Sequence, residues 1–194
     1  MGKIEYRLIH TGQHYDRVMS GSFFEQLNIP QPDINLGVGV FQAYQTANIM
    51  IRYEEAINDW KPEMCIVVGD VTSTMACALV AKKAGLKVAH VEGGIRSGDM
   101  SMPEEINRIV TDSITDYFFT TSNVANANLR SQGVSRENIF FVGNTMIDSL
   151  MGNKDKLIKP DFFDDISLGD DPMPLLSLVA TLHSHLMLII PKIY

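Results

Sequence analysis

Short apolar runs alternate with helix-like stretches along most of this chain, and this alternation constrains its fold more than any other feature. The expected strands are 4–10, 64–68, 86–91, 117–121 and 139–142. The expected helices are 22–27, 41–60, 72–84, 103–113, 123–131 and 144–151. Strands that alternate with helices form βαβ units, whose strands are parallel neighbours in one sheet. The sequence therefore predicts an α/β fold with a mostly parallel sheet whose faces are covered.

The net charge limits the kinds of partner that the chain can bind, and the absence of a targeting signal indicates where it is located. The 194 residues carry a formal net charge of −7 without a local basic stripe, which argues against a nucleic-acid or anionic-membrane partner. Residues 1–10 lack the apolar core of a signal peptide, and polar residues interrupt the longest apolar stretch, 175–190. Cys65 and Cys77 form no C-x-x-C motif. We therefore expect a reduced, cytoplasmic protein.

Composition divides the chain into three parts. Residues 1–152 hold the alternating elements and are expected to form one domain. Residues 153–174 combine Asp and Lys with scattered Gly and Pro, which is typical of a linker or an exposed loop. Residues 175–194 contain one strand candidate, 176–182, followed by too little sequence to build a domain. They are expected to be the start of a second domain or an aberrant tail.

Acidic residues follow two of the expected strands. Asp70 comes after strand 64–68, and Glu92 comes directly after strand 86–91. In open α/β sheets ligands bind outside the carboxyl ends of the strands, so we expect both carboxylates at one site. Two carboxylates in a partly dry site push their pKa values apart, which provides an acid and a base. Alternatively, Asp70 only caps the helix that begins near Thr72, which is the favoured interpretation for this residue alone.

The surroundings of Glu92 allow two interpretations as well. The following Gly93 and Gly94 let a ligand approach the backbone closely, or they only make a turn. His90 shares a strand face with Glu92. For His90 we slightly favour a core histidine that bonds to the Glu92 carboxylate.

The segment 101–108 carries a helix start and two candidate functional groups. Ser101 and Glu104 have the S-x-x-E spacing of a capping box, with Pro103 in the first turn. The helix N-terminus favours the ionised form of Glu104, which suits a base better than an acid. Arg108 lies four residues after Glu104 on the same helix face. It forms either an intrahelical ion pair, worth about 0.3–0.5 kcal/mol, or a guanidinium site for phosphate or carboxylate.

Several strings are more specific together than apart. HTGQHYD, FFEQLNIP, VVGDVTST, AHVEGGIRSGD, MPEEINR and VGNTMIDSL occur in this order over residues 10–150. The set resembles the non-hydrolysing UDP-N-acetylglucosamine 2-epimerases, a family of isomerases, over nearly all of that span. The resemblance implies a doubly wound, Rossmann-like N-terminal half of a two-domain architecture similar to glycosyltransferase B, with the substrate between the halves.

The resemblance also implies a reaction, the interconversion of UDP-GlcNAc and UDP-ManNAc without an external redox cofactor. A base removes the C2 proton and UDP leaves C1, which gives 2-acetamidoglucal. Protonation on the opposite face of C2 and re-addition of UDP complete the inversion. Proton transfer needs poised carboxylates, and the leaving diphosphate needs cationic or amide donors. The sequence itself contains no metal-ligand spacing and no Walker A, dinucleotide-binding or G-x-S-x-G motif.

Site residues are carried over motif by motif. Asp70 in VVGD, Glu92 in HVEGG and Glu104 in MPEEINR resemble the acidic catalytic residues of the family. Arg108 in the last of these motifs resembles a substrate contact. Which carboxylate removes the C2 proton, and which one returns it, is left open.

Three further residues are implied by the resemblance. His183 ends a T-L-H string that matches the start of a histidine motif in the family's second domain, so it is a fourth candidate catalytic residue. Gln13 and His14 are candidate contacts to a second, activating UDP-GlcNAc or to the substrate. The implied partners are a UDP-sugar and, since family members often form dimers, a second copy of the chain.

Two departures from the family pattern affect the expected activity. The family begins with a strand and a G-T-R-P-E loop, whereas this chain starts about where the second strand should be. Most of the second domain is also missing. We therefore expect a sheet without a central strand and a chain that is inactive alone. Two alternatives stay open, namely a UDP-2,3-diacetamido-uronic acid 2-epimerase and a non-catalytic fragment that acts only by binding or association.

Overall fold

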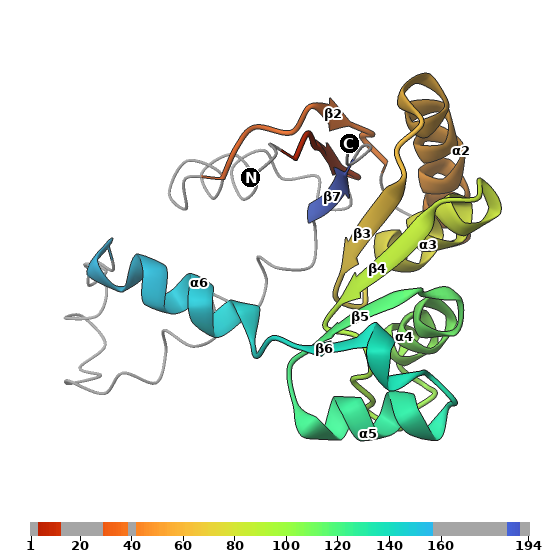
Figure 1. The fold of residues 1–194 in the computed structure, drawn as a ribbon. Helices are drawn as coiled ribbons and strands as arrows, with labels where there is room; N and C mark the ends of the chain where they lie inside the picture. Colours follow the sequence, from red (N-terminus) through yellow and green to blue (C-terminus); the bar gives the residue numbers. More distant parts are fainter. Residues whose placement is uncertain (1–3, 13–28, 39–41, 157–185, 191–194) are drawn as a thin grey trace, which may run out of the picture.

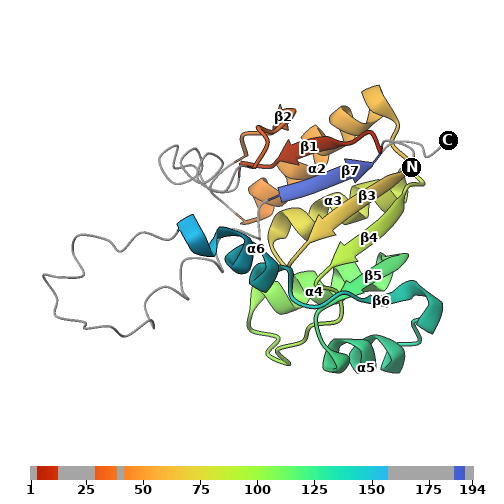
Figure 2. The same cartoon turned by 60° about the vertical axis from the view of Figure 1, so that its left-hand side comes forward.

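The computed structural model describes residues 4–12, 29–38, 42–156 and 186–190. These residues form a seven-stranded sheet with the order β2-β1-β7-β3-β4-β5-β6 (Figures 1 and 2). Its strands are β1 Arg7–His10, β2 Ile34–Asn35, β3 Met64–Val68, β4 Lys87–Val91, β5 Tyr117–Thr120, β6 Ile139–Phe141 and β7 Leu186–Ile190. The chain therefore has the α/β architecture that the alternating pattern predicts.

The sheet consists of two parallel parts joined by one antiparallel strand. Strands β3 to β6 are neighbours in chain order and all parallel, and β1 is parallel to β2. Strand β7 runs antiparallel to both β1 and β3 and lies between them. The expectation of a missing central strand is thus wrong for this sheet. A strand from the C-terminal region occupies the gap and pairs with two edges that would otherwise be open.

Five α-helices and two short 3-10 helices accompany the described strands. They are α2 Gln42–Trp60, α3 Thr72–Lys83, α4 Pro103–Ile114, α5 Asn123–Ser131, η1 Arg136–Asn138, α6 Thr145–Asn153 and η2 Lys154–Lys156. Helix α3 packs against both α2 and α4, and these three helices lie side by side next to the sheet (Figure 1). Helix α5 packs against β5 and β6. This arrangement brings the start of α4 to the ends of β3 and β4.

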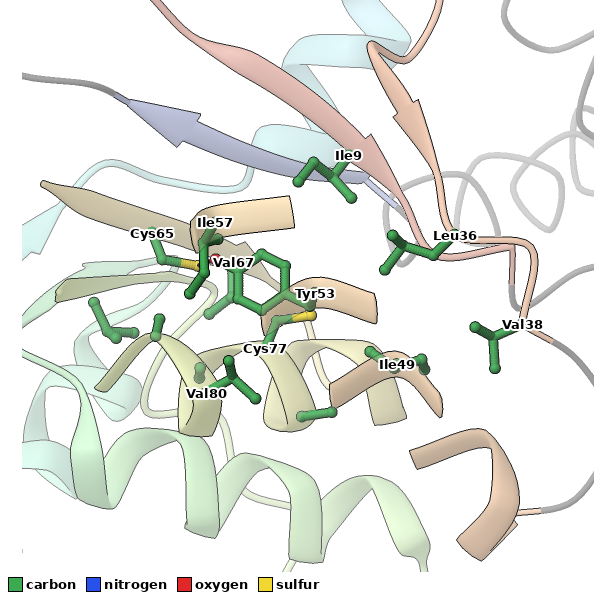
Figure 3. Close-up of a cluster of buried hydrophobic side chains, with 14 residues drawn as sticks. Ile9, Leu36, Val38, Ile49, Tyr53, Ile57, Cys65, Val67, Cys77 and Val80 are labelled. Atoms are coloured by element: carbon green, nitrogen blue, oxygen red, sulfur yellow. Dashed lines mark hydrogen bonds between the residues drawn. The ribbon is translucent and has the colours of Figure 1, made fainter. Parts of the chain in front are cut away.

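The main hydrophobic core lies between the sheet and helices α2 and α3 (Figure 3). Ile49, Tyr53 and Ile57 are spaced four residues apart on α2, so they form one buried stripe. The Tyr53 hydroxyl donates to Cys65 Sγ at 3.1 Å. Burial raises the pKa of the Cys65 thiol to about 12, although the Tyr53 hydrogen bond acts in the opposite direction. Cys65 is therefore a packing residue rather than a reactive thiol.

Most of the predicted elements agree with the structure. Strand 64–68 and helix 123–131 have the predicted bounds, whereas β1 begins at Arg7 rather than at residue 4. The helix expected at 22–27 and the strand expected at 176–182 lie outside the described residues. The division into a domain, a linker and a third part stays a prediction. Among the described residues, no helix is long and apolar enough to cross a membrane.

Candidate functional site

The candidate site lies where the neighbouring strands β3 and β4 end. Val68 and Val91 are register partners and the last residues of the two strands. Gly69 and Glu92 follow them directly. Both have a left-handed backbone, with φ of 70° at Gly69 and 72° at Glu92. The Gly69 N–H donates to Val91 O at 3.0 Å, which ties the strand ends together. Asp70 and Glu92 therefore leave the sheet from adjacent strands, as their sequence positions predict.

Asp70 is held by helix α4. Its carboxylate forms an ion pair with the Arg108 guanidinium, and its backbone carbonyl accepts a hydrogen bond from Asn107 Nδ2 at 2.8 Å. The Asp70 side chain is 26% exposed and the Arg108 side chain 16%. The expected N-cap role of Asp70 is wrong, because Val71 occupies the N-cap position of α3 and makes no side-chain capping bond. The carboxylate is turned towards α4 instead.

Arg108 joins Asp70 to a second carboxylate, Glu105, which is only 2% exposed. Arg108 Nη1 lies 3.4 Å from Glu105 Oε2. Glu105 also accepts hydrogen bonds from the Ser97 amide at 2.9 Å, the Ser97 hydroxyl at 3.0 Å and the Gly98 amide at 3.2 Å. Burial raises the pKa of Glu105, but these donors and Arg108 outweigh it and hold the pKa below its ordinary value. Glu105 thus fixes both the arginine and the loop that precedes α4.

Glu104 stands in the first turn of α4 and is half-buried. The expected capping box does not form, because Met102 is the N-cap residue and has no side-chain capping bond. Ser101 Oγ donates to Asp99 Oδ1 at 2.7 Å instead. Both alternatives for Arg108 are met in part, because it forms an intrahelical pair with Glu105 rather than with Glu104 and its guanidinium also binds the Asp70 carboxylate. Glu104 is left at the helix N-terminus with its carboxylate outside this network.

The backbone around Glu92 is sterically confined. A Cβ on Gly93 would lie 2.9 Å from the Phe118 ring, and a Cβ on Gly94 would lie 2.6 Å from Ala125 O. The Glu92 N–H donates to Phe119 O at 2.9 Å. A left-handed conformation costs a residue with a side chain roughly 1–2 kcal/mol. The tight packing of the glycine pair and this hydrogen bond hold Glu92 in that conformation.

His90 is fully buried, but its carboxylate partner is Asp112 of α4 and not Glu92 as expected. His90 Nδ1 lies 2.7 Å from Asp112 Oδ1, and His90 Nε2 lies 2.8 Å from Gly69 O. The other oxygen of Asp112 accepts from the Gly94 N–H at 3.0 Å and pairs with Arg96 at 2.7 Å. Burial raises the pKa of Asp112, but His90 and Arg96 outweigh burial and lower it.

Helix α4 turns a polar face towards the sheet. Glu105 and Asp112 are buried, whereas Ile106 and Ile109 are 44% and 38% exposed. The sequence analysis assigned no role to Glu105 and Asp112. Their positions relative to Arg108, three residues before and four after, place all three groups on one helix face. This spacing is visible in the sequence, and it indicates that the helix face towards the sheet binds charged groups.

Three predicted site residues, Gln13, His14 and His183, lie outside the described residues and are not placed. Within the described parts of the chain, no group of three or more His, Cys, Asp or Glu side chains could hold a metal ion. Of the predicted site residues, the structure joins Asp70 and Arg108 directly, places Glu92 after the neighbouring strand end and places Glu104 in the first turn of α4.

Comparison with known proteins identifies the family. The family model for UDP-N-acetylglucosamine 2-epimerase matches residues 1–178. The chain belongs to the UDP-N-acetylglucosamine 2-epimerase family. A relative of that name from Methanocaldococcus jannaschii is 41% identical over 174 residues, which cover 87% of this chain and 47% of the relative. The UDP-2,3-diacetamido-2,3-dideoxy-D-glucuronate 2-epimerase of Pseudomonas aeruginosa is 40% identical and covers 91% of this chain and 54% of the relative.

Solved structures agree with this family assignment. The M. jannaschii UDP-GlcNAc 2-epimerase in complex with UDP-GlcNAc and UDP superposes with a TM-score of 0.76 at 42% identity. The match covers 81% of this chain and 44% of the M. jannaschii chain. This 2-epimerase-family chain thus spans about half the length of the relatives that it matches. Its parallel strands β3 to β6 agree with the Rossmann-like N-terminal half of those enzymes.

Proposed function

We propose that this chain carries the proton-transfer part of a UDP-N-acetylglucosamine 2-epimerase active site. One observation carries the proposal, namely the Asp70 carboxylate at the end of β3, partly exposed and held in an ion pair by Arg108. Glu92 leaves the neighbouring strand one residue beyond the paired Val91. Acid–base epimerisation at C2 needs at least one carboxylate to take the proton and one group to return it. The site offers Asp70, Glu92 and Glu104 for these steps.

Each group has a distinct part in the proposed reaction. One of the three carboxylates removes the C2 proton, and UDP leaves C1. A second carboxylate protonates the other face of C2 in the 2-acetamidoglucal intermediate as UDP adds back to C1. Arg108 is the cation that pairs with Asp70, and we propose that it contacts the UDP-sugar. A guanidinium offers several N–H donors to phosphate or carboxylate oxygens. Glu105 keeps this guanidinium in place from its buried side.

The remaining parts of the proposal concern residues outside the described ranges. His183 is proposed as a further catalytic group, and Gln13 and His14 as contacts to a UDP-sugar. Because the chain spans about half the length of its relatives, we expect full turnover to need groups that their other half provides. The chain alone is therefore expected to be inactive as an epimerase.

The test uses this chain and a chimera. In the chimera, residues 42–120 of this chain replace the equivalent segment of the M. jannaschii 2-epimerase. Proton NMR in deuterated buffer follows deuterium entry at C2 of UDP-GlcNAc and the appearance of UDP-ManNAc. We expect turnover by the chimera that Asp70→Asn or Glu92→Gln abolishes, while Asp59→Asn, an exposed carboxylate at the end of α2, leaves it unchanged. A folded but inactive chimera would contradict the proposal.

A second candidate substrate is UDP-2,3-diacetamido-2,3-dideoxy-D-glucuronate. The specific observation in its favour is the P. aeruginosa relative of that activity, which is 40% identical and covers 91% of this chain. Both nucleotide sugars are offered to the same chimera, and turnover of the uronate alone would favour this candidate. If neither Asp70→Asn nor Glu92→Gln reduces turnover of either sugar, the alternative of a non-catalytic chain is the better account.

A further inference from the structure

Asp112 is a buried carboxylate whose hydrogen bonds lead to both strand ends of the site. It is 4% exposed. Its Oδ1 lies 2.7 Å from His90 Nδ1, and its Oδ2 accepts the Gly94 N–H at 3.0 Å. His90 continues the connection, because its Nε2 lies 2.8 Å from Gly69 O. One side chain of α4 therefore bonds to the turn after β4 directly and to the turn after β3 through an imidazole.

The bonded groups are the peptide units beside the candidate carboxylates. Gly69 immediately precedes Asp70, and Gly94 follows Glu92 by two residues. Glu92 has a φ of 72°, a backbone conformation that residues with a side chain rarely adopt. Such a conformation persists only where the surrounding structure imposes it. The Gly94 bond to Asp112 is part of what imposes it here.

The hydrogen-bond partners define where the protons of His90 lie. Gly69 O is a carbonyl and only accepts, so His90 Nε2 must donate to it. On the other side of the ring, Asp112 is held ionised by the Gly94 N–H and by Arg96, whose Nη1 lies 2.7 Å from Oδ2. An ionised carboxylate also only accepts, so His90 Nδ1 donates as well.

Stabilisation of the fold alone explains the contacts among His90, Asp112 and Arg96 poorly. A buried ion pair gives little net stability compared with well-packed apolar side chains of similar volume. Its distinct effect is a fixed geometry, since each donor and acceptor has one direction and low-dielectric surroundings make misalignment costly.

We propose that His90 and Asp112 are positioning residues for the proton transfer assigned above. The pair, with both imidazole nitrogens protonated, holds the ends of β3 and β4 so that Asp70 and Glu92 leave the sheet in a fixed relative position. The inference rests on the proposed function of those two carboxylates, whereas the geometry that it predicts can be measured without any activity.

The first test uses the ¹⁵N-histidine-labelled 194-residue chain and NMR of the imidazole nitrogens. His90→Gln identifies the His90 signals. We expect both His90 nitrogens to carry hydrogen in the wild type. In Asp112→Asn the side-chain amide faces Nδ1, so this nitrogen is expected to lose its hydrogen. Asp116→Asn is the matched control, because Asp116 also accepts a backbone N–H, from Val88 at 2.9 Å, but at the other end of β4. It should leave the His90 signals unchanged.

The second test measures amide hydrogen exchange at Gly94 and Gly69 under native conditions. A hydrogen bond to a charged acceptor is stronger than one to a neutral acceptor, so Asp112→Asn should speed exchange at Gly94 roughly tenfold. Asp116→Asn lowers overall stability but should change the ratio of Gly94 exchange to core exchange by less than twofold. If Asp112→Asn does not fold, His90→Gln takes its place. The Gly69 carbonyl then loses its imidazole donor, so we expect a less fixed turn and faster exchange of the Gly69 amide, which bonds to Val91 O at 3.0 Å.

The outcomes separate this inference from the proposed function. A neutral His90 ring in the wild type, or unchanged Gly94 exchange in Asp112→Asn, would overturn the positioning role whatever the activity. Two protonated nitrogens and accelerated Gly94 exchange would support it. If the Asp70→Asn chimera retained full turnover while these NMR results held, the proposed function would fail and the geometric finding would stand.

Discussion

The Arg108 guanidinium on α4 forms an ion pair with the Asp70 carboxylate, 38 residues earlier in the chain. The same guanidinium contacts Glu105 one helical turn before it. Arg108 therefore fastens the start of α4 to the end of β3. Because the Asn107 side chain also bonds to the Asp70 carbonyl, both the backbone and the side chain of Asp70 depend on the position of α4.

Arg108→Lys should weaken this attachment without removing the charge. An ammonium group cannot reproduce the fork with which a guanidinium reaches two carboxylates. We expect a loss of about 1.5–3 kcal/mol in the free energy of unfolding, since one hydrogen bond to a charged group is lost. Urea denaturation at pH 7 provides the measurement. Arg130→Lys, at an exposed position near the end of α5, is the matched control and should change stability by less than about 0.5 kcal/mol. Equal effects of the two variants would contradict the bridging role of Arg108.

Glu105 should make stability depend on pH in the acidic range. Burial raises its pKa, but the amides of Ser97 and Gly98, the Ser97 hydroxyl and Arg108 outweigh burial, so the pKa in the folded chain lies below the ordinary value of 4.5. As the pH falls, the unfolded chain therefore binds this proton first. The stability that ionised Glu105 contributes is fully present above pH 4.5 and is lost as the pH falls through the folded-state pKa.

The free energy of unfolding in urea, measured between pH 6 and pH 3 at intervals of about half a pH unit, gives this dependence. Glu105→Gln should be less stable than the wild type at pH 6, and its stability should fall less steeply below pH 4.5. Glu137→Gln alters an exposed carboxylate of η1 and is the control. A Glu105→Gln curve parallel to that of the wild type would show that the carboxylate contributes nothing through its ionised form.

Gly94 and Gly98 form a natural pair for testing steric confinement near Glu92. Both have positive φ, 82° and 74°, so alanine is strained at either position. At Gly94 the added Cβ would also lie 2.6 Å from Ala125 O, whereas at Gly98 it meets nothing within 4 Å. We expect Gly98→Ala to cost about 1 kcal/mol and Gly94→Ala to cost about 3 kcal/mol or more because the backbone must shift. Thermal and urea unfolding measure the stability loss of each variant. Similar losses in Gly94→Ala and Gly98→Ala would mean that the turn can relax freely.

The sequence predicted the positions of Asp70 and Glu92 but not their partners. The alternation of strands and helices is enough to bring the ends of β3 and β4 together, because parallel neighbours end at the same edge. Partners were inferred from local spacing, which suggested Glu104 for Arg108 and Glu92 for His90. The structure pairs these residues with Asp70 and Asp112 across longer stretches of chain. Spacing rules describe contacts within one element, whereas here the tertiary contacts between α4 and the strand ends decide.

The direction and the neighbours of the antiparallel strand β7 could not be predicted from sequence patterns either. An apolar run such as 186–190 indicates a buried strand, but nothing in it specifies a direction or a neighbour. Its place depends on the open edges of β1 and β3, which are separated from it by most of the chain. The family resemblance explains why a gap was expected at this position, and the structure adds that a different segment fills it.

Leu188→Pro tests whether β7 joins the two parts of the sheet. Leu188 is the register partner of Leu8 in β1 and of Ile66 in β3. Proline lacks the N–H group and is excluded from central strands, so we expect a loss of about 3 kcal/mol and faster amide exchange in both neighbouring strands. Leu188→Ala keeps the N–H and separates the effect of the side chain from that of the backbone. If proline and alanine have the same effect, or if exchange in β1 and β3 is unchanged in the proline variant, β7 does not hold the sheet together.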